Sequence, residues 1–473
     1  MQIPILKGIY TTDDRADYRT AYPRNLVPVP KAQGLSRGYL RPSEGLEVIA
    51  SLGSPLATDR GGIIWRGEHY RVMGNLLVRI TASDEIVIIG DVGTDARLVT
   101  FARGFDNLGI ASNRNLFIYD GNTIQQNVDP DLGEVLDLIW IDGYYLTIDG
   151  EFLTVTELTD PLAVNLLKFG SSEIDPDPVI AVVKIRNEVI AVNRYSVESF
   201  DNVGGDADQF PFRRIEGAQL NRGAVGTHAA CEFRQALAFV GSAIDETIAV
   251  WIGGNGTTRK ISTREIDQIL EEYTEQELSF ISIETRLFKG HENLYIHLPN
   301  ETLVFDANAT EVLQTPVWYT LDSGNQERSR YRAFNYIYVH NKWYCGDPNS
   351  QNLCCMTDEH SHHYGQVIGW QFGTDIIFNE TSGFIVHEIK LTGLTGRVAL
   401  DVEPIIYTSH SLDGVTFSAE RPKAVGERYD RVRKIIWHRL GETNYQRIQM
   451  FRGTSDAHIG IARIDAVFEA LTY

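Results

Sequence analysis

The sequence predicts an all-β protein, in which a β-propeller-like repeat domain precedes a C-terminal antiparallel β-sandwich. Three observations favour this fold class. Short runs of alternating apolar and polar residues recur along most of the chain, and Asn, Gly or Asp residues separate them. The runs form pairs that start roughly 30 to 50 residues apart, close to the period of a four-stranded propeller blade. Clear helical periodicity is confined to one stretch, which argues against a helical solenoid.

Residues 1–48 are predicted to form an N-terminal arm. Pro23, Pro28 and Pro30 keep part of this stretch out of helical geometry, because proline and the residue before it favour extended backbone. A long leader of this kind either lies along the surface of its own chain or docks on a neighbouring subunit. The sequence leaves both alternatives open.

Residues 49–364 are predicted to form the propeller-like domain, with about six or seven blades. The evidence is a series of strand pairs that turn at residues suited to tight hairpins. These pairs span residues 70–78, 108–119, 138–148, 182–192, 236–251, 287–305 and 334–345. A protein built of several plain sandwiches is the alternative.

Residues 262–307 depart from this pattern. Ser262 and Glu265 have the spacing of a capping box, and Thr274 and Glu277 repeat it, so a second short turn or helix is expected there. The apolar face of the first helix comprises Ile266, Ile269, Leu270 and Tyr273. We therefore predict a helical insertion near 262–280, followed by a hairpin.

Residues 365–473 are predicted to form the sandwich. Apolar strands are expected at residues 389–391, 404–407, 415–417, 435–437, 448–451 and 459–461. Asp413 and Gly414 form a strong tight-turn signal between two of them. Charged and apolar residues also alternate from Asp430 to Ile435, which predicts a half-buried strand there.

The composition limits the class of protein. The 473 residues carry a formal net charge of −20, which argues against a protein whose whole surface grips nucleic acid. The four cysteines are sparse, so we expect folding in a reducing, cytoplasmic compartment. We expect neither a secretory signal nor a membrane-spanning segment, because no suitable apolar run is present.

Two clusters have the residue types of metal sites. Asp201, Asp206 and Asp208 could offer oxygen ligands to calcium, but the spacing fits an acidic turn better. The second cluster, with Cys and His ligands suited to zinc, comprises Cys345, Cys354, Cys355, His360, His362 and His363. Its spacing matches no standard zinc site, and a solvated loop is the preferred interpretation. We predict no metal, no cofactor and no catalytic residue, and no enzymatic motif is evident.

Charge is distributed unevenly near the C-terminus. Residues 421–463 contain ten Lys or Arg residues and four acids, so this window is basic within an acidic chain. The candidate interface residues here are Arg431, Arg433, Lys434 and Arg439. Such a surface is either a solvated sheet face or a contact with an acidic partner, which is another copy of this chain or DNA phosphate. A protein partner is favoured.

The inserted helix supplies the acidic candidates. Asp267, Glu271 and Glu272 lie on its expected polar side. The helix either packs on its own domain or forms a subunit contact in which these carboxylates meet a basic neighbour.

The sequence resembles the tail-hub proteins of short-tailed (podovirus) bacteriophages, also called packaged-DNA-stabilisation proteins. The likeness is carried by scattered stretches in the same order as in that family. They are Gly38-Tyr39-Leu40-Arg41, the capped segment 262–277, His297-Leu298-Pro299 with 304–307, Cys345-Gly346-Asp347, Asp413-Gly414, and 429–437 with Arg439. Cys354, Cys355 and the histidines at 360–363 depart from the family pattern, which indicates a local variable loop.

The resemblance implies a structural, non-enzymatic protein of the virion tail, assembled in the host cytoplasm. It implies self-assembly into a ring, expected to be a hexamer, below the portal-adaptor complex. The ring would continue the DNA channel, help to retain packaged DNA, and dock a tail needle and tailspikes. DNA would pass through the lumen without sequence-specific binding, and no membrane would be involved. The alternatives are a propeller that binds a protein or glycan, and a propeller glycoside hydrolase.

Overall fold

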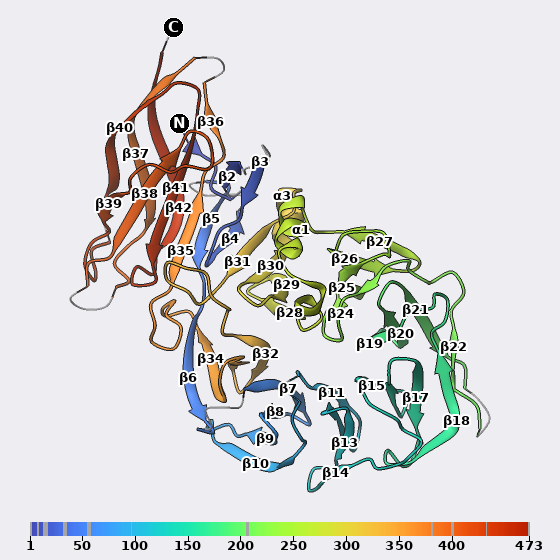
Figure 1. Cartoon of the computed structure of the whole chain (residues 1–473). Helices are drawn as coiled ribbons and strands as arrows, with labels where there is room; N and C mark the ends of the chain where they lie inside the picture. Colours follow the sequence, from blue (N-terminus) through green and yellow to red (C-terminus); the bar gives the residue numbers. More distant parts are fainter. Residues whose placement is uncertain are drawn as a thin grey trace. The chain divides into compact units, whose positions relative to one another are not determined.

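The structure is a computed structural model (Figure 1). It describes residues 2–6, 9–12, 18–31, 36–53, 58–95, 97–204, 208–379, 382–398, 402–431 and 433–471. These residues contain 42 strands and three helices. The chain divides into two compact units. Unit 1 comprises Met1–Glu47, Arg286–Tyr331 and Met356–Tyr473, and unit 2 comprises Val48–Thr285 and Arg332–Cys355.

Unit 2 is built of consecutive antiparallel sheets, which follow one another along an arc in Figure 1. The first sheet contains β7 (Asp59–Trp65), β8 (Glu68–Met73), β9 (Leu76–Ile80) and β10 (Ile86–Asp91). The second contains β11 (Thr100–Arg103), β12 (Leu108–Ser112), β13 (Asn115–Tyr119) and β14 (Ile124–Gln126). The third contains β15 (Asp137–Ile141), β16 (Tyr144–Ile148), β17 (Phe152–Thr156) and β18 (Val164–Ser171). In each sheet the strands are joined in chain order.

The next two sheets of unit 2 continue this arrangement. The fourth contains β19 (Val179–Ile185), β20 (Glu188–Asn193), β21 (Val197–Asn202) and β22 (Phe212–Arg214). The fifth contains β23 (Gly223–Ala224), β24 (Ala230–Phe233), β25 (Ala236–Ser242), β26 (Ala249–Gly254) and β27 (Thr257–Lys260).

Two further four-stranded sheets are present, one with its strands mainly in unit 1 and the other with its strands mainly in unit 2. One contains β28 (Ser282–Phe288), β29 (His291–His297), β30 (Thr302–Asp306) and β31 (Trp318–Leu321). The other contains β32 (Phe334–Val339), β33 (Lys342–Gly346), β34 (Asn352–Thr357) and β6 (Gly45–Ser51). The described residues thus form seven such sheets, which agrees with the six or seven blades predicted.

Two-residue turns explain why the predicted hairpins form. Asn113 and Arg114 join β12 to β13, and both have positive φ angles, of 51° and 59°. Asp142 and Gly143 join β15 to β16 with φ angles of 49° and 95°. Turns with two positive φ angles match the twist of paired strands, which is why Asn, Asp and Gly favour them. These hairpins are confirmed.

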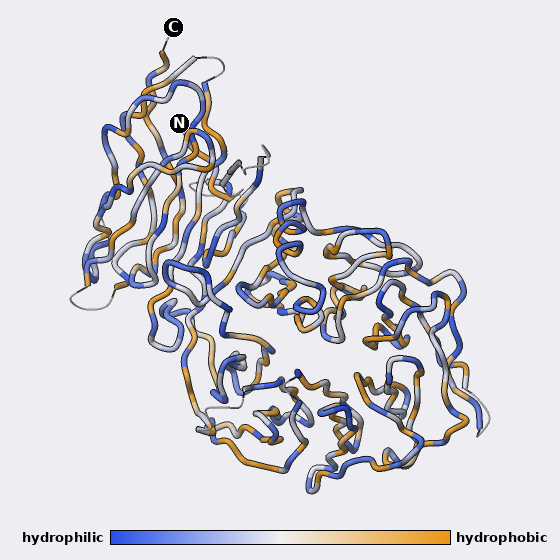
Figure 2. The backbone as a smooth tube through the Cα atoms, in the orientation of Figure 1, coloured by the Kyte–Doolittle hydropathy of each residue, from blue (hydrophilic) through white to orange (hydrophobic). Residues whose placement is uncertain are grey.

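The core of unit 2 lies between successive sheets. The first strands β7, β11, β15 and β19 contact one another in that order. Buried apolar clusters span successive sheets: one contains Trp65 and Leu108, and another contains Leu116 and Leu138. Figure 2 shows hydrophobic residues interspersed with hydrophilic ones along the sheets of unit 2.

The helical insertion comprises α1 (Arg264–Glu271) and α2 (Glu275–Leu278). The capping box at Thr274 and Glu277 is confirmed, since each side chain bonds to the other residue's backbone N–H. The predicted box at Ser262 is wrong, because Thr263 is the N-cap of α1. The Ser262 hydroxyl instead donates to Asp267 Oδ1 at 2.6 Å.

A third helix, α3 (Ala307–Leu313), was not predicted. Asp306 ends β30 and caps α3 by accepting a hydrogen bond from the Ala309 N–H at 2.8 Å. A left-handed Gln314, with φ of 56°, ends the helix. So short a helix has too few turns to show a clear apolar face in the sequence.

The sandwich in unit 1 has two antiparallel sheets. One contains β4 (Leu26–Pro30), β5 (Gly38–Pro42), β42 (Gly460–Ala470), β37 (Phe384–Leu394) and β40 (Ile435–Thr443), with β1 (Gln2–Ile3) paired to β42. The other contains β35 (Gly369–Gly373), β41 (Gln446–Thr454), β38 (Ile405–Ser411) and β39 (Arg421–Ala424), with β36 (Ile377–Phe378) paired to β41. A separate hairpin joins β2 (Ile9–Thr12) and β3 (Tyr18–Ala21).

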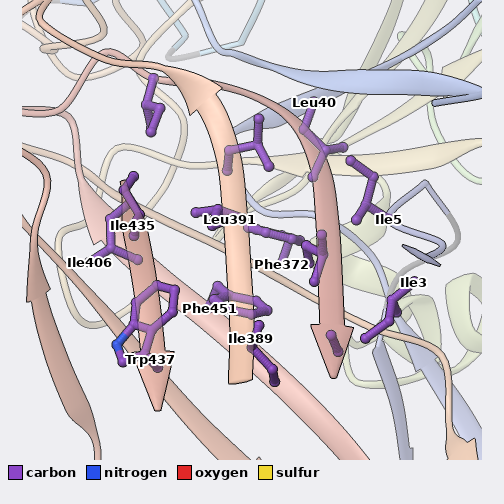
Figure 3. Packing of buried hydrophobic residues seen from close by; sticks show 14 of the residues in the cluster. Ile3, Ile5, Leu40, Phe372, Ile389, Leu391, Ile406, Ile435, Trp437 and Phe451 are labelled. Carbon is purple, nitrogen blue, oxygen red and sulfur yellow. The ribbon is translucent and has the colours of Figure 1, made fainter. Parts of the chain in front are cut away.

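The N-terminal segment belongs to the sandwich core. Ile3, Ile5 and Leu40 are buried, and Figure 3 shows them beside Leu391 and Phe372 from the C-terminal part of the chain. Strands near the N-terminus therefore complete a sheet whose other strands follow residue 383. The boundaries at residues 48 and 364 stay a prediction.

The predicted strand from Asp430 to Ile435 is wrong, because β40 begins only at Ile435. Tyr429 has a left-handed backbone with φ of 71°, and its N–H donates to the Gly396 carbonyl at 3.1 Å. This bond ties the segment to a neighbouring loop, and its alternating charges do not lie in a sheet. In the described ranges, no helix is long and apolar enough to cross a membrane.

Candidate assembly interface

The acidic candidates on α1 have different environments. Asp267 is only 7% exposed, and its carboxylate accepts from Lys260 Nζ and from the Ser262 hydroxyl. Glu271 and Glu272 are exposed, at the last residue and the C-cap of the helix. Helix carbonyls place partial negative charge at that end, so two carboxylates there do not stabilise the helix. Glu271 and Glu272 therefore remain available to a cationic partner, whereas Asp267 is already paired.

Residues 421–463 offer fewer cations to a partner than their composition indicates, because several of them already bind groups of the same chain. Arg447 is buried, donates to the Leu440 carbonyl, and has its pKa lowered to about 10 by burial and then by the charge of Arg421. Arg452 pairs with Glu420. Arg421 donates to two backbone carbonyls, and Arg463 pairs with Asp465. These four cations are occupied by the fold itself.

The four basic candidates are all exposed. Arg431, Arg433 and Lys434 lie close together before β40, whereas Arg439 lies within β40, with a positive φ of 54°. Arg433 approaches Glu403 at 3.5 Å and Asp430 at 3.8 Å, which are loose, solvent-exposed contacts. The basic candidates belong to unit 1 and the acidic candidates to unit 2.

Arg431 also lines a groove of about 770 Å³ in unit 1. Lys289, Arg397 and Arg428 supply further positive charge to the same groove. Lys289 is distant in the sequence from the other three residues, so the cluster of positive charge at residues 421–463 could not predict that Lys289 lines this groove. Arg428 was visible within the window but had no feature to distinguish it.

Several residues of the Cys and His cluster considered as a zinc site make other contacts. Cys345 and Cys354 face each other as a register pair of β33 and β34. His360 Nε2 lies 2.9 Å from Glu47 Oε1, and His362 Nδ1 lies 2.9 Å from the Ser455 hydroxyl. Among the described residues, no group of three or more His, Cys, Asp or Glu side chains could hold a metal. Asp206 of the acidic turn lies outside the described residues.

These sheets and this core define a protein of the β-propeller and β-sandwich class. Residues 1–361 match the family described as bacteriophage P22 Gp10, β-propeller, and residues 369–469 match bacteriophage P22 Gp10, β-sandwich. The chain belongs to the bacteriophage P22 Gp10 family. This confirms the predicted fold class and the predicted resemblance to podovirus tail-hub proteins.

Individual relatives are more distant. The chain is 24% identical over 457 residues to the tail hub protein gp10 of Salmonella phage P22, covering 93% of each chain. Among solved structures, PorZ of Porphyromonas gingivalis is 12% identical with a TM-score of 0.38, over 66% of this chain and 37% of that one. The Pan2 WD40 domain of Neurospora crassa is 8% identical with a TM-score of 0.41, over 66% of this chain and 93% of that one. These structural likenesses have no bearing on function.

Proposed function

We propose that this protein is the structural hub of a short-tailed phage tail and that its copies assemble into a ring, expected to be a hexamer. The observation that carries the proposal is the family match, which extends over both the propeller and the sandwich. The likeness to the tail hub protein of phage P22 covers nearly the whole of both chains, so it supports a role for the intact protein.

Charge separation within the chain supports self-association. Glu271 and Glu272 are exposed in unit 2, and Arg431, Lys434 and Arg439 are exposed in unit 1. A contact in which different surfaces of two copies meet generates a ring if the rotation closes. In our proposal, Glu271 and Glu272 at the end of α1 in one copy face the exposed cations Arg431, Lys434 and Arg439 of the next copy.

The ring would lie below the portal-adaptor complex and continue the DNA channel. The adaptor protein, a tail needle and tailspikes are its proposed partners. The net charge of −20 suits a channel through which DNA passes without sequence-specific binding, since like charge repels the duplex and leaves it free to slide. No enzymatic step is proposed, and assembly in the host cytoplasm is part of the proposal.

The test is the assembly state of the purified full-length chain, alone and mixed with adaptor rings. Mass photometry and negative-stain microscopy should show closed rings that cap the adaptor. A protein that stays monomeric and does not bind the adaptor rings would contradict the proposal. Monomers that bind glycans would favour a binding propeller, and glycan turnover would favour a hydrolase.

A further inference from the structure

The groove that contains Arg431 has more positive charge than its own acids neutralise. Lys289, Arg397, Arg428 and Arg431 line it, against the carboxylates of Asp358, Glu359 and Asp456. Asp358 already accepts from Lys289 at 2.5 Å and from Arg41 at 3.2 Å. Asp456 accepts from the Thr454 hydroxyl at 2.9 Å.

The three arginines of the groove are the cations that remain. Arg397, Arg428 and Arg431 are exposed, and none forms an ion pair with any residue that the structure describes. Guanidinium groups bind carboxylates through paired hydrogen bonds, and they lose little hydration when they do so. Three of them around one groove therefore provide a site for an acidic segment.

The loops that carry these arginines are fixed to each other. The Tyr429 N–H donates to the Gly396 carbonyl at 3.1 Å, and the Thr395 hydroxyl donates to the Asp430 carbonyl at 2.7 Å. Gly426 has φ of 107°, and a Cβ at this position would lie 2.8 Å from Asp430 Oδ2. The backbone that carries the arginines is thus held in position before any partner arrives, which reduces the loop-ordering entropy lost on binding.

Tyr429 is unusual within this arrangement. It is a bulky residue with a left-handed backbone, at φ of 71°, and yet its side chain is 69% exposed. The Arg428 guanidinium lies over its ring, 5.1 Å from the centroid. Backbone strain of this kind persists where the surrounding structure enforces it, and it gathers at binding sites. Tyr429 presents an aromatic face beside the arginines instead of burying it.

We propose that this groove binds a carboxylate-rich segment of a second copy of this chain, and that the acidic end of α1, with Glu271 and Glu272, is that segment. The inference rests on the proposed ring and names its contact. A second copy is a suitable partner because the chain carries a net charge of −20. DNA is the less suitable partner, because the groove has only one more cation than carboxylates, which suits a short acidic segment better than the many phosphates of a duplex.

The test reverses charge at each side of the contact. The groove variant is Arg428→Glu/Arg431→Glu, and its matched control is Arg186→Glu/Arg259→Glu, which changes two exposed cations of unit 2 by the same amount. The swap variant adds Glu271→Lys/Glu272→Lys to the groove variant. Circular dichroism and thermal unfolding of each variant establish that it is folded.

Mass photometry should show that the groove variant forms rings at least about tenfold less readily than the wild type and the control. The swap variant should recover much of that loss, because an acidic groove then meets a basic helix end. Rings that tolerate the groove variant, or a swap variant no better than the groove variant, would overturn the inference. Rings that fail in the wild type would instead count against the proposed function.

A direct binding measurement separates these failures further. A fluorescent peptide of residues 262–280 should bind the full-length wild type, in low salt, at least about tenfold more tightly than it binds the groove variant. Equal binding would overturn the inference, whether or not rings form. A short DNA duplex that binds more tightly than the peptide, and is lost in the groove variant, would assign the groove to nucleic acid instead.

Discussion

Asp59 and Arg71 form an ion pair between β7 and β8 in which both side chains are 0% exposed. Arg71 Nε lies 2.6 Å from Asp59 Oδ2, and its Nη2 lies 2.8 Å from Oδ1. Gly346 leaves room for the pair, since a Cβ there would lie 2.5 Å from Asp59 Cγ. Each charge depends on the other, because neither reaches water.

Removal of one partner should therefore be costly. We expect Asp59→Ala to lower the free energy of unfolding by about 3–5 kcal/mol, because it leaves a buried guanidinium without a counter-ion. Urea unfolding followed by circular dichroism measures this change. The matched control is Asp106→Ala, which removes an exposed partner of Arg66 and should cost at most about 1 kcal/mol. Equal effects of the two variants would contradict the prediction.

His69 makes the stability of the fold sensitive to acid. It is 0% exposed, its ring lies 5.1 Å from that of Tyr344, and burial, followed by the charge of Arg71, lowers its pKa to about 2. The unfolded chain binds this proton near pH 6.5, whereas the folded protein does not. The unfolded state therefore gains stability as the pH falls below about 6.5, at up to about 1.4 kcal/mol per pH unit.

A variant without the imidazole tests this account. His69→Phe retains an aromatic ring beside Tyr344 and removes the titrating group. We expect its free energy of unfolding to fall less steeply than that of the wild type between pH 6.5 and pH 4. His458, whose pKa burial lowers to about 4, stays in both proteins and accounts for part of the remaining slope. Parallel slopes in the two proteins would show that His69 is not the source.

Among the secondary-structure elements, α1 allows the effect of a substitution on helix stability to be measured separately from its effect on ring assembly. Its last turn contains no basic residue, and Glu271 and Glu272 lie near the negative end of the helix dipole. Glu271→Lys/Glu272→Lys should leave the free energy of unfolding unchanged or raise it by about 0.3–1 kcal/mol per residue. The same variant should weaken ring assembly in mass photometry. Weaker ring assembly by a variant that is at least as stable as the wild type distinguishes a contact surface from a folding defect.

The control for this helix variant keeps the overall charge change the same. Glu151→Lys/Glu216→Lys alters two exposed acids of unit 2 outside α1. Assembly should tolerate that variant. If both variants weaken the rings equally, the cause is the net charge of the protein, and α1 has no special part.

At the scale of the whole molecule, the N-terminal segment is predicted to be essential to the sandwich. Leu40 in β5 is 0% exposed and pairs in register with Ile461 of β42. Leu40→Ala should lower the free energy of unfolding by about 2–5 kcal/mol, because it leaves a cavity in a packed core. Leu412→Ala, at a side chain that is 50% exposed, is the matched control and should cost far less. Similar costs in urea unfolding would show that the segment lies outside the core.

Much of the fold could be predicted because its information is local. Alternation with period two and tight-turn residues located hairpins such as that at Asp142 and Gly143 without any knowledge of their partners. The box at Thr274 and Glu277 is equally local and was predicted. Ser262 illustrates the limit of this reasoning: its hydroxyl bonds to a buried carboxylate instead of the helix N-terminus, and only the packing around Asp267 explains that choice.

From the residues alone, most hairpins, the helical insertion and the likeness to phage tail hubs could therefore be predicted, whereas the strands expected at 415–417 and 430–435 are absent from the described residues. Long-range packing set which strands share a sheet, because alternation specifies the face of a strand and not the identity of its neighbour. It joined Leu40 to Ile461 and brought Lys289 to the groove of Arg431. It also buried Asp267 while leaving Glu271 and Glu272 exposed, since burial depends on what packs above a residue. No short stretch of sequence contains long-range contacts of this kind, because they join residues that are far apart in the chain.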